Sequence, residues 1–456
     1  MPYPSQVPNS IGHVESIKDE TLIEDLGNFE YDPPSPEEAN DFDSVPAREL
    51  SGSDDLGPSF ESVYGLDGSR VEIPVGDPRF NKRIGVIDIA LINLDIGTLN
   101  EEARKAYVTP SKVDGLGTEH HVRMALPSTN TRYEAPTVHE SWRKMTFHNF
   151  QEKSVFDQTL FDIYFNLLER AGRFHNNRIR IEQCPAQDCN HGPQFVNSTS
   201  PDYCPVCGTT IYPTDPLRVH ERVTGSQSNE AALNVLMGLI EHMVLLGAAD
   251  NVWYDNPAEL ETTAFIKDGP LAQFDTAAWI HEPIHNKLSQ FQRYLRDNGR
   301  QPLVYMGIHK TGDFAAYAQE VRDYLDGPTV LPLSNEDIYE HVIAGDRTAE
   351  YAIKTYYGKN FLYKSAKGNG TGHCLPFLIP RRYEEGPLGE KQGDATIVQD
   401  PDAYEELARA ISLLERLRTV QYTDGIIPLV LAHEAASIPE DLGRRVFGRI
   451  AEKVTR

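Results

Sequence analysis

Apolar stretches typical of helices and of strands alternate along the second half of the chain, and this alternation limits the folds open to it. The helix-like stretches cover residues 229–249, 285–299 and 314–327, and the strand-like stretches cover residues 262–271 and 302–310. Strands that alternate with helices are typical of a sheet with helices on both faces. Residues 62–75 and 83–97 resemble earlier strands in hairpin-like succession. We therefore expect an α/β fold with a mixed sheet flanked by helices.

Other segments complete this outline. A helix is expected within residues 152–174, two strands at 359–365 and 373–380, and three C-terminal helices at 402–421, 429–437 and 440–454. These assignments rest on apolar residues at three- and four-residue spacing for helices and on short apolar runs for strands. Residues 101–150 are mixed, and no function is assigned to them.

The negative charge of the chain is concentrated at its N-terminus. The 456 residues carry a net charge of −25, and the first 60 residues hold fourteen Asp and Glu against two Lys and Arg, a net of −12. We interpret residues 1–58 as an acidic, partly disordered leader and residues 59–456 as the main domain. A strongly acidic chain repels phosphates, so any contact with DNA is expected to be local or shared with a partner.

Composition and termini favour a cytoplasmic protein without a membrane span. Hydrophobic residues make up 39% of the chain, and its apolar runs are expected to fall short of the ~20 residues that a span needs. The N-terminus has no basic segment followed by an apolar one, so no secretory signal is expected. The phosphate-binding pattern G-x-x-x-x-G-K-[ST] is absent from the sequence, so ATP dependence would have to come from a partner.

Four of the five cysteines form two close pairs. The pairs are Cys184 with Cys189 and Cys204 with Cys207, separated by a short loop. This spacing predicts a tetrahedral structural Zn²⁺ site in a zinc-ribbon-like insert over residues 180–215, and a closed four-thiolate site leaves no position for water. His191 is an alternative ligand, and the fifth cysteine, Cys374, is interpreted as a buried small residue.

Two strand-like stretches about 200 residues apart each end in Asp-Gly, at Asp67-Gly68 and Asp268-Gly269. Asp-Gly favours turns through local hydrogen bonding and positive φ, so both steps have a purely structural explanation. The other explanation is that both strand ends deliver a carboxylate to one metal site. Carboxylate oxygens are the hard ligands that Mg²⁺ and Mn²⁺ prefer.

Three further residues are candidates for the same site. Glu241 interrupts an apolar helix, and a lone buried Glu is costly unless it is paired or metal-bound, although it could instead lie exposed at an edge. His433 stands near the start of a helix after an apolar run, where a histidine is often structural. Lys310, at the end of a strand, could meet a phosphate or remain solvated.

These signals occur in the order found in the NurA family of nucleases, which the chain resembles from about residue 60 to its C-terminus. The resemblance rests on "LDGSR" at 66–70, "LMGLIEHMVLL" at 236–246, "FIKDGPL" at 265–271, "GIHKTGDF" at 307–314 and "PLVLAHEAASI" from 428 to 438. The family often has a Tyr-Pro step shortly before its final His. This chain instead reads "QYTDGIIPLVLAH", in which neither Tyr422 nor Asp424 has the expected spacing.

The resemblance implies an RNase H-like (Piwi-like) core, in which the first and fourth strands are neighbours, so that Asp67 and Asp268 would converge. It implies that Asp67, Glu241 and Asp268 hold Mn²⁺ or Mg²⁺, two ions in all, with His433 as a further ligand or a water-orienting group. It also implies a homodimer that cuts DNA beside a HerA-type hexameric ATPase, in end resection and repair or in antiviral defence.

Two other functions remain open at this stage. A non-catalytic adaptor would use the same fold and the zinc module to dock a DNA translocase or nucleic acid, with the Asp-Gly steps serving as turns. An RNA-directed nuclease with the same core would be separated by comparing DNA and RNA substrates. The cleavage polarity, the preference for single strands or duplex ends, and activity without the motor are not predicted.

Overall fold

The computed structural model describes residues 44–49, 57–76, 79–103, 117–343, 352–365, 374–384, 396–419 and 425–438. All of these residues belong to the unit Asp43–Arg456. Most of the expected leader at 1–58, the expected helix at 440–454, and Tyr422 and Asp424 lie outside the described residues.

One large mixed sheet organises the described residues. Its nine strands lie in the order β1-β14-β15-β16-β13-β12-β2-β3-β4. Their bounds are β1 (Val45–Pro46), β2 (Ser62–Pro74), β3 (Arg83–Asp95), β4 (Gly117–Pro127), β12 (Thr263–Asp268), β13 (Val304–Ile308), β14 (Thr329–Pro332), β15 (Gly358–Lys364) and β16 (Cys374–Pro380). Strand β12 pairs in parallel with both β2 and β13, whereas β2-β3-β4 and β13-β16-β15-β14 pair antiparallel. The expected mixed sheet is confirmed.

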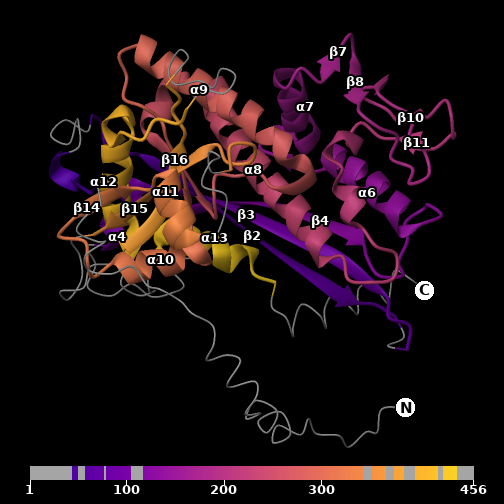
Figure 1. Cartoon of the computed structure of the whole chain (residues 1–456), viewed down its shortest axis with the longest axis horizontal. Coiled ribbons are helices and arrows are strands. Elements are labelled where there is room, and N and C mark those ends of the chain that lie inside the picture. The colour runs from indigo at the N-terminus through magenta and orange to yellow at the C-terminus, as the bar shows by residue number, and fades with distance from the viewer. Residues whose placement is uncertain are drawn as a thin grey trace, which may run out of the picture. The chain divides into compact units, whose positions relative to one another are not determined.

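Helices cover both faces of this sheet, as expected (Figure 1). One face packs against α6 (Val138–Glu152), α7 (Leu160–Arg170), α8 (Glu230–Asp255) and α9 (His281–Asp297). The other face packs against α4 (Ile96–Ala103), α12 (Leu407–Leu417) and α13 (Ile427–Ala436). Helices α10 (Asp313–Val321) and α11 (Asn335–Asp337) follow β13 and β14. The long strands β2 and β3 contact both α8 and α13.

Short strands form small separate sheets. They are β5 (Ser154–Val155) with β6 (Gln158–Thr159), β7 (Phe174–His175) with β8 (Arg178–Ile181) and β9 (Gln194–Asn197), β10 (Asp202–Tyr203) with β11 (Thr210–Ile211), and β17 (Arg418–Thr419) with β18 (Gly425–Ile426). The expected helix at 152–174 therefore begins only at Leu160, because the β5–β6 hairpin precedes it. Thr159 and Asp162 form a capping box that defines this start.

Helix α8 is the central helix on its face of the sheet. It is 26 residues long and, by length and composition alone, long and apolar enough to cross a membrane, so the expectation that apolar runs fall short of this length is wrong. However, 72% of its most apolar 18-residue window is buried inside the protein. A helix that is apolar on every side is typical of a core helix in a large domain.

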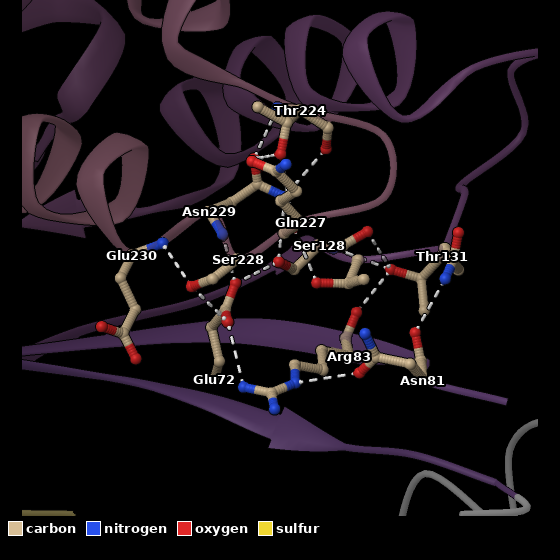
Figure 2. Close-up of polar contacts among 12 residues, drawn as sticks. Glu72, Asn81, Arg83, Ser128, Thr131, Thr224, Gln227, Ser228, Asn229 and Glu230 are labelled. Carbon is tan, nitrogen blue, oxygen red and sulfur yellow. Dashed lines mark hydrogen bonds and ion pairs between the residues drawn. The ribbon is translucent and has the colours of Figure 1, made fainter. Parts of the chain in front are cut away.

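A buried carboxylate in the sheet anchors the start of α8. Figure 2 shows Glu72 of β2 beside the residues that precede the helix. Its Oε1 accepts a 2.6 Å hydrogen bond from the backbone N–H of Asn229, and its Oε2 accepts one of 2.8 Å from the hydroxyl of Ser228. Ser128 also donates to Glu72, and Arg83 lies 3.4 Å from it. A negative charge at a helix N-terminus is favourable, so this contact holds α8 in register with β2.

The expected turn at Asp67-Gly68 is wrong. Strand β2 continues through both residues to Pro74, and Gly68 pairs with Ile89 of β3. Pairing with the long strand β3 outweighs the local turn preference of Asp-Gly. What ends near Asp67 is the parallel neighbour β12, whose last partner on β2 is Leu66.

Candidate metal centre and zinc module

Asp67 and Asp268 occupy adjacent positions on neighbouring parallel strands. Lys267 of β12 pairs with Leu66 of β2, so each aspartate is the next residue along its strand. Side chains alternate between the two faces of a strand, and Ile266 belongs to the core that contains α13. Both aspartates therefore lie on the α13 face, at the position where the sequence predicts that they converge.

Asp268 ends its strand and pairs with a lysine. Gly269 follows with φ of +93°, so the expected turn is present at this Asp-Gly step, and glycine adopts that backbone conformation without steric cost. The Nζ atom of Lys310, just beyond β13, lies 2.8 Å from Oδ2 of Asp268. The Lys310 side chain is 26% exposed, so its ammonium group is accessible to solvent.

Asp67 is buried and contacts His433. Its Oδ2 lies 2.8 Å from Nδ1 of His433 on α13, and its Oδ1 accepts a 2.7 Å hydrogen bond from the backbone N–H of Gly68. Burial and the negative charge of Asp268 raise the pKa of Asp67 to about 6, although Lys310 and His433 oppose this rise. The side chain of His433 is 66% exposed, so its ring also faces solvent.

Glu241 of α8 approaches strands β2 and β12 from the opposite face of the sheet. It is buried, as its place in an apolar helix predicts, and its Oε2 lies 2.7 Å from Nζ of Lys267. The same ammonium group donates a 2.7 Å hydrogen bond to the backbone carbonyl of Asp268. A side chain at position 68 would place its Cβ 2.5 Å from Oε1 of Glu241, so Gly68 permits this close approach. The exposed-edge interpretation of Glu241 is wrong.

The acidic residues do not form a ready-made cage for a cation. Among the residues that the structure describes, the four zinc-module cysteines are the only set of three or more His, Cys, Asp or Glu whose ligand atoms all lie within 4.8 Å of one another. Glu241 and Asp268 are instead held by Lys267 and Lys310. Carboxylates and an imidazole suit Mn²⁺ or Mg²⁺ chemically, but a metal would have to displace a lysine to use Oε2 of Glu241 or Oδ2 of Asp268.

His242, the neighbour of Glu241, positions the loop behind Asp268. Its Nε2 lies 2.8 Å from the carbonyl oxygen of Ala272, and its Nδ1 lies 2.7 Å from the hydroxyl of Tyr357. Full burial lowers the pKa of His242 well below its usual value, so the ring is neutral. A neutral ring that donates from Nε2 and accepts at Nδ1 satisfies both contacts.

The four predicted zinc ligands lie together. The sulfur atoms of Cys184 and Cys207 are 3.6 Å apart, and those of Cys189 and Cys204 are 3.9 Å apart. A tetrahedral site with Zn–S bonds of ~2.3 Å requires sulfur atoms about 3.8 Å apart, so the residues present fit zinc. His191 is not part of this group. The fifth cysteine, Cys374, is buried in β16 as expected.

Sequence reasoning missed two charged groups beside the predicted residues. One is Lys267, whose pairing with Glu241 depends on how α8 packs on β12. The other is Asp88, which is buried in β3 between Ile87 and Ile89. Asp88 interrupts an apolar run just as Glu241 does. The same signal therefore could have found Asp88, whereas no sequence pattern pointed to the partner of Glu241.

Comparison with known proteins gives structural matches alone. No protein-family model matches the chain, and no curated protein matches it. The chain is similar to the NurA nuclease from Sulfolobus solfataricus over 99% of its length and 98% of that chain, with 8% identity and a TM-score of 0.38. A second structure, of NurA, matches over 97% and 96% of the two chains, with 9% identity and a TM-score of 0.27. A structure of NurA with manganese matches over 96% of both chains, with 10% identity and a TM-score of 0.24.

These matches agree with the resemblance in the motifs, but their TM-scores are too low to carry an argument about fold or chemistry. The functional conclusions therefore rest on the residues of this chain.

Proposed function

We propose that the protein is a metal-dependent DNA nuclease that hydrolyses phosphodiester bonds. The observation that carries this proposal is the placement of Asp67 and Asp268 side by side on parallel strands, with His433 in contact with Asp67. Burying Asp67 beside the second carboxylate of Asp268 costs free energy, and a divalent cation would offset that cost. Perturbed acids of this kind are typical of functional sites.

The order of strands supports an RNase H-like core. Counted from β2, the fourth strand of the large sheet is β12, and β12 lies directly beside β2. The same relation between first and fourth strands would be needed to bring the two aspartates together in such a core. The central strands run in the order β4-β3-β2-β12-β13, with the first three antiparallel and the last two parallel to β2.

Under this proposal Asp67, Asp268 and His433 hold Mn²⁺ or Mg²⁺ from the α13 face, and Glu241 adds its carboxylate from the α8 face where Gly68 leaves room for it, two ions in all. Such ions, when bound, activate water and stabilise the leaving oxygen of the phosphodiester. The protein contributes the buried carboxylates, the imidazole of His433 and the ammonium of Lys310. The positive charge of Lys310 acts on both aspartates, since it lowers the pKa of Asp67 and forms an ion pair with Asp268. Once a cation takes Asp268, that ammonium is free to contact a phosphate.

The partners in this proposal are DNA, a second copy of the chain and a HerA-type hexameric ATPase. The sequence has no phosphate-binding loop of its own, which leaves ATP-driven movement of DNA to a motor. The N-terminal leader or the zinc module would be the docking element for the motor, and action on DNA ends would serve resection and repair or antiviral defence.

One observation favours the non-catalytic adaptor as a second candidate. Glu241 and Asp268 each already have a lysine within 2.8 Å, so the charges are balanced without a metal. In an adaptor these pairs would be permanent structural contacts, and divalent cations would not bind.

Cleavage of labelled linear DNA with Mn²⁺ tests the proposal, with and without a HerA-type ATPase. The comparison is between the wild type, Asp268→Ala, and a matched control, Asp326→Ala, at an exposed position before β14. We expect Mn²⁺-dependent cutting that Asp268→Ala reduces at least 100-fold and that the control leaves unchanged, because one acid of the site is lost. A wild type that binds the ATPase but never cuts DNA would favour the adaptor. Cutting of RNA but not DNA would favour the RNA-directed enzyme.

A further inference from the structure

A buried carboxylate on β3 has no role in the site described above. Asp88 is 7% exposed and lies in the middle of an apolar strand. Its Oδ2 accepts a 2.7 Å hydrogen bond from Nε of Arg123, and its Oδ1 lies 2.9 Å from Nδ1 of His121. Both partners come from β4, the edge strand of the sheet. Burying an acid costs free energy unless hydrogen bonds or opposite charges offset it, and for Asp88 the two β4 side chains provide these contacts.

This cluster lies on the same face of the sheet as Asp67. Asp67 pairs with Ala90, which in turn pairs with His121, and the next row crosses from Ser69 through Asp88 to Arg123. Because every second residue of a strand faces the same way, all of these side chains project to the α13 side. The side chain between Asp67 and His121 is only the methyl group of Ala90.

Arg123 is held at one end and open at the other. Asp88 binds its Nε, and its Nη2 lies 3.0 Å from His121, whereas Nη1 has no partner within the part of the chain that the structure describes. The Arg123 side chain is 61% exposed, against 10% for Asp88. An arginine anchored through Nε presents its terminal N–H groups in a fixed direction, which suits a phosphate. Glu119, 3.6 Å from His121, is itself 47% exposed.

We propose that Arg123, oriented by Asp88 and flanked by His121, binds a backbone phosphate of the DNA strand whose scissile bond lies at Asp67 and Asp268. Strands lie about 4.8 Å apart, so β4 is roughly 10 Å from β2 across the sheet. This distance is greater than the spacing of neighbouring phosphates on a strand, so the subsite contacts a phosphate other than the one at the scissile bond. The proposal rests on the proposed function for the identity of the polymer.

The simpler explanation is an ion pair that only stabilises the pairing of β3 with β4. It accounts for the 2.7 Å contact, whereas the 61% exposure of the arginine also leaves its terminal N–H groups accessible to a ligand. The two explanations make different predictions for Asp88. If Asp88 only adds negative charge near the DNA, its removal strengthens DNA binding; if Asp88 orients Arg123, its removal weakens binding.

DNA binding without cleavage tests the inference. Fluorescence anisotropy of a labelled single-stranded oligonucleotide would be followed without added divalent cation, over a series of salt concentrations. The variants are Arg123→Gln, Asp88→Asn and a matched control, Arg296→Gln, which removes an exposed arginine paired with Glu405 from α9. Thermal unfolding of each variant would show that it is folded.

We expect Arg123→Gln to weaken binding roughly fivefold and to reduce the slope of log K against log salt by ~0.7, the value for one phosphate contact on a single strand. Asp88→Asn should also weaken binding, and Arg296→Gln should match the wild type. An Arg123→Gln variant with wild-type affinity and slope would overturn the inference, as would equal losses in Arg123→Gln and Arg296→Gln. Tighter binding by Asp88→Asn would overturn the orienting role of Asp88.

Failure of the nuclease proposal is distinguishable from failure of this inference. A wild type that binds the oligonucleotide through Arg123 but never cuts DNA would refute the nuclease and leave the phosphate subsite standing. A wild type that cuts DNA with Mn²⁺, together with an Arg123→Gln variant that binds DNA normally, would support the nuclease and refute the phosphate subsite.

Discussion

The carboxyl group of Asp67 interacts electrostatically with most of the charged groups of the site. Its pKa is raised by burial and by the negative charges of Asp268 and Glu241, and it is lowered by Lys310 and by the hydrogen bond to His433. The net result of these effects is a raised pKa of about 6, compared with 3.8 for an ordinary aspartate. The ionised form is therefore costly in the folded chain, which is the condition under which a bound cation stabilises most.

This raised pKa predicts a pH-dependent cost to stability. Because the folded chain binds the proton more tightly than the unfolded chain does, the free energy of unfolding should rise as pH falls from about 6 to 4. Above pH 6 the ionised group costs up to about 3 kcal/mol. Asp67→Asn removes that cost and loses one hydrogen bond, so we expect it to be about 1–3 kcal/mol more stable than the wild type above pH 6.

Urea denaturation between pH 4 and pH 8, without divalent cations, measures this difference. The gap between Asp67→Asn and the wild type should shrink toward pH 4, where the wild-type carboxyl group is protonated. The control Asp326→Asn, at an exposed position, should show no such pH-dependent gap. A gap that stays constant across this range would contradict the raised pKa of Asp67.

At the scale of elements, the contact between β2 and α8 depends on a glycine. Gly68 leaves room for Oε1 of Glu241, and an added Cβ would lie 2.5 Å from that atom. Gly68→Ala should therefore displace Glu241 and weaken its buried ion pair with Lys267, which we expect to cost about 2–3 kcal/mol. Gly238, in the interior of α8, has no atom within 4 Å of an added Cβ.

Gly238→Ala is the matched control for this prediction. It should stabilise the protein by about 0.5–1 kcal/mol, because alanine is a better helix former than glycine. Opposite signs for the same chemical change, measured by urea denaturation, would show that Gly68 is required by the approach of Glu241. If Gly68→Ala were as stable as the wild type, the strand and α8 would not be in the tight contact that the structure shows.

The strands and helices that sequence reasoning predicted are those whose signals are local. Long runs such as residues 83–97 and 229–249 predicted β3 and α8 because their apolar patterns leave few alternatives. The same reasoning failed at Asp67, where a local turn preference competes with pairing to a distant strand. It located Glu241 because a charge in an apolar helix is unusual, but its partner Lys267 follows only from the packing of α8 on β12.

At the scale of the whole molecule, a few basic side chains lie beside the two aspartates although the chain as a whole is acidic. The chain carries a net charge of −25, yet Lys310, His433 and Arg123 all lie on or near the α13 face beside the two aspartates. Under the proposed function, a strand of DNA would be held by Lys310 and Arg123, with the ring of His433 beside them, rather than by a broad basic surface. A motor that feeds the strand would reduce the need for long-range electrostatic attraction.

The zinc module belongs to the same hydrophobic core as α6, α7 and α8, since three of its cysteines (Cys184, Cys189 and Cys204) and residues of strands β8, β9 and β11 pack into that core. Its metal should therefore contribute to the stability of the whole domain while taking no part in chemistry. We expect one Zn²⁺ per chain in the wild type and none in Cys204→Ser, which should unfold at a temperature several degrees lower. Cys374→Ser, at a buried cysteine on β16, is the matched control and should retain its zinc. Elemental analysis with thermal unfolding measures both quantities, and full zinc content in Cys204→Ser would refute the four-cysteine site.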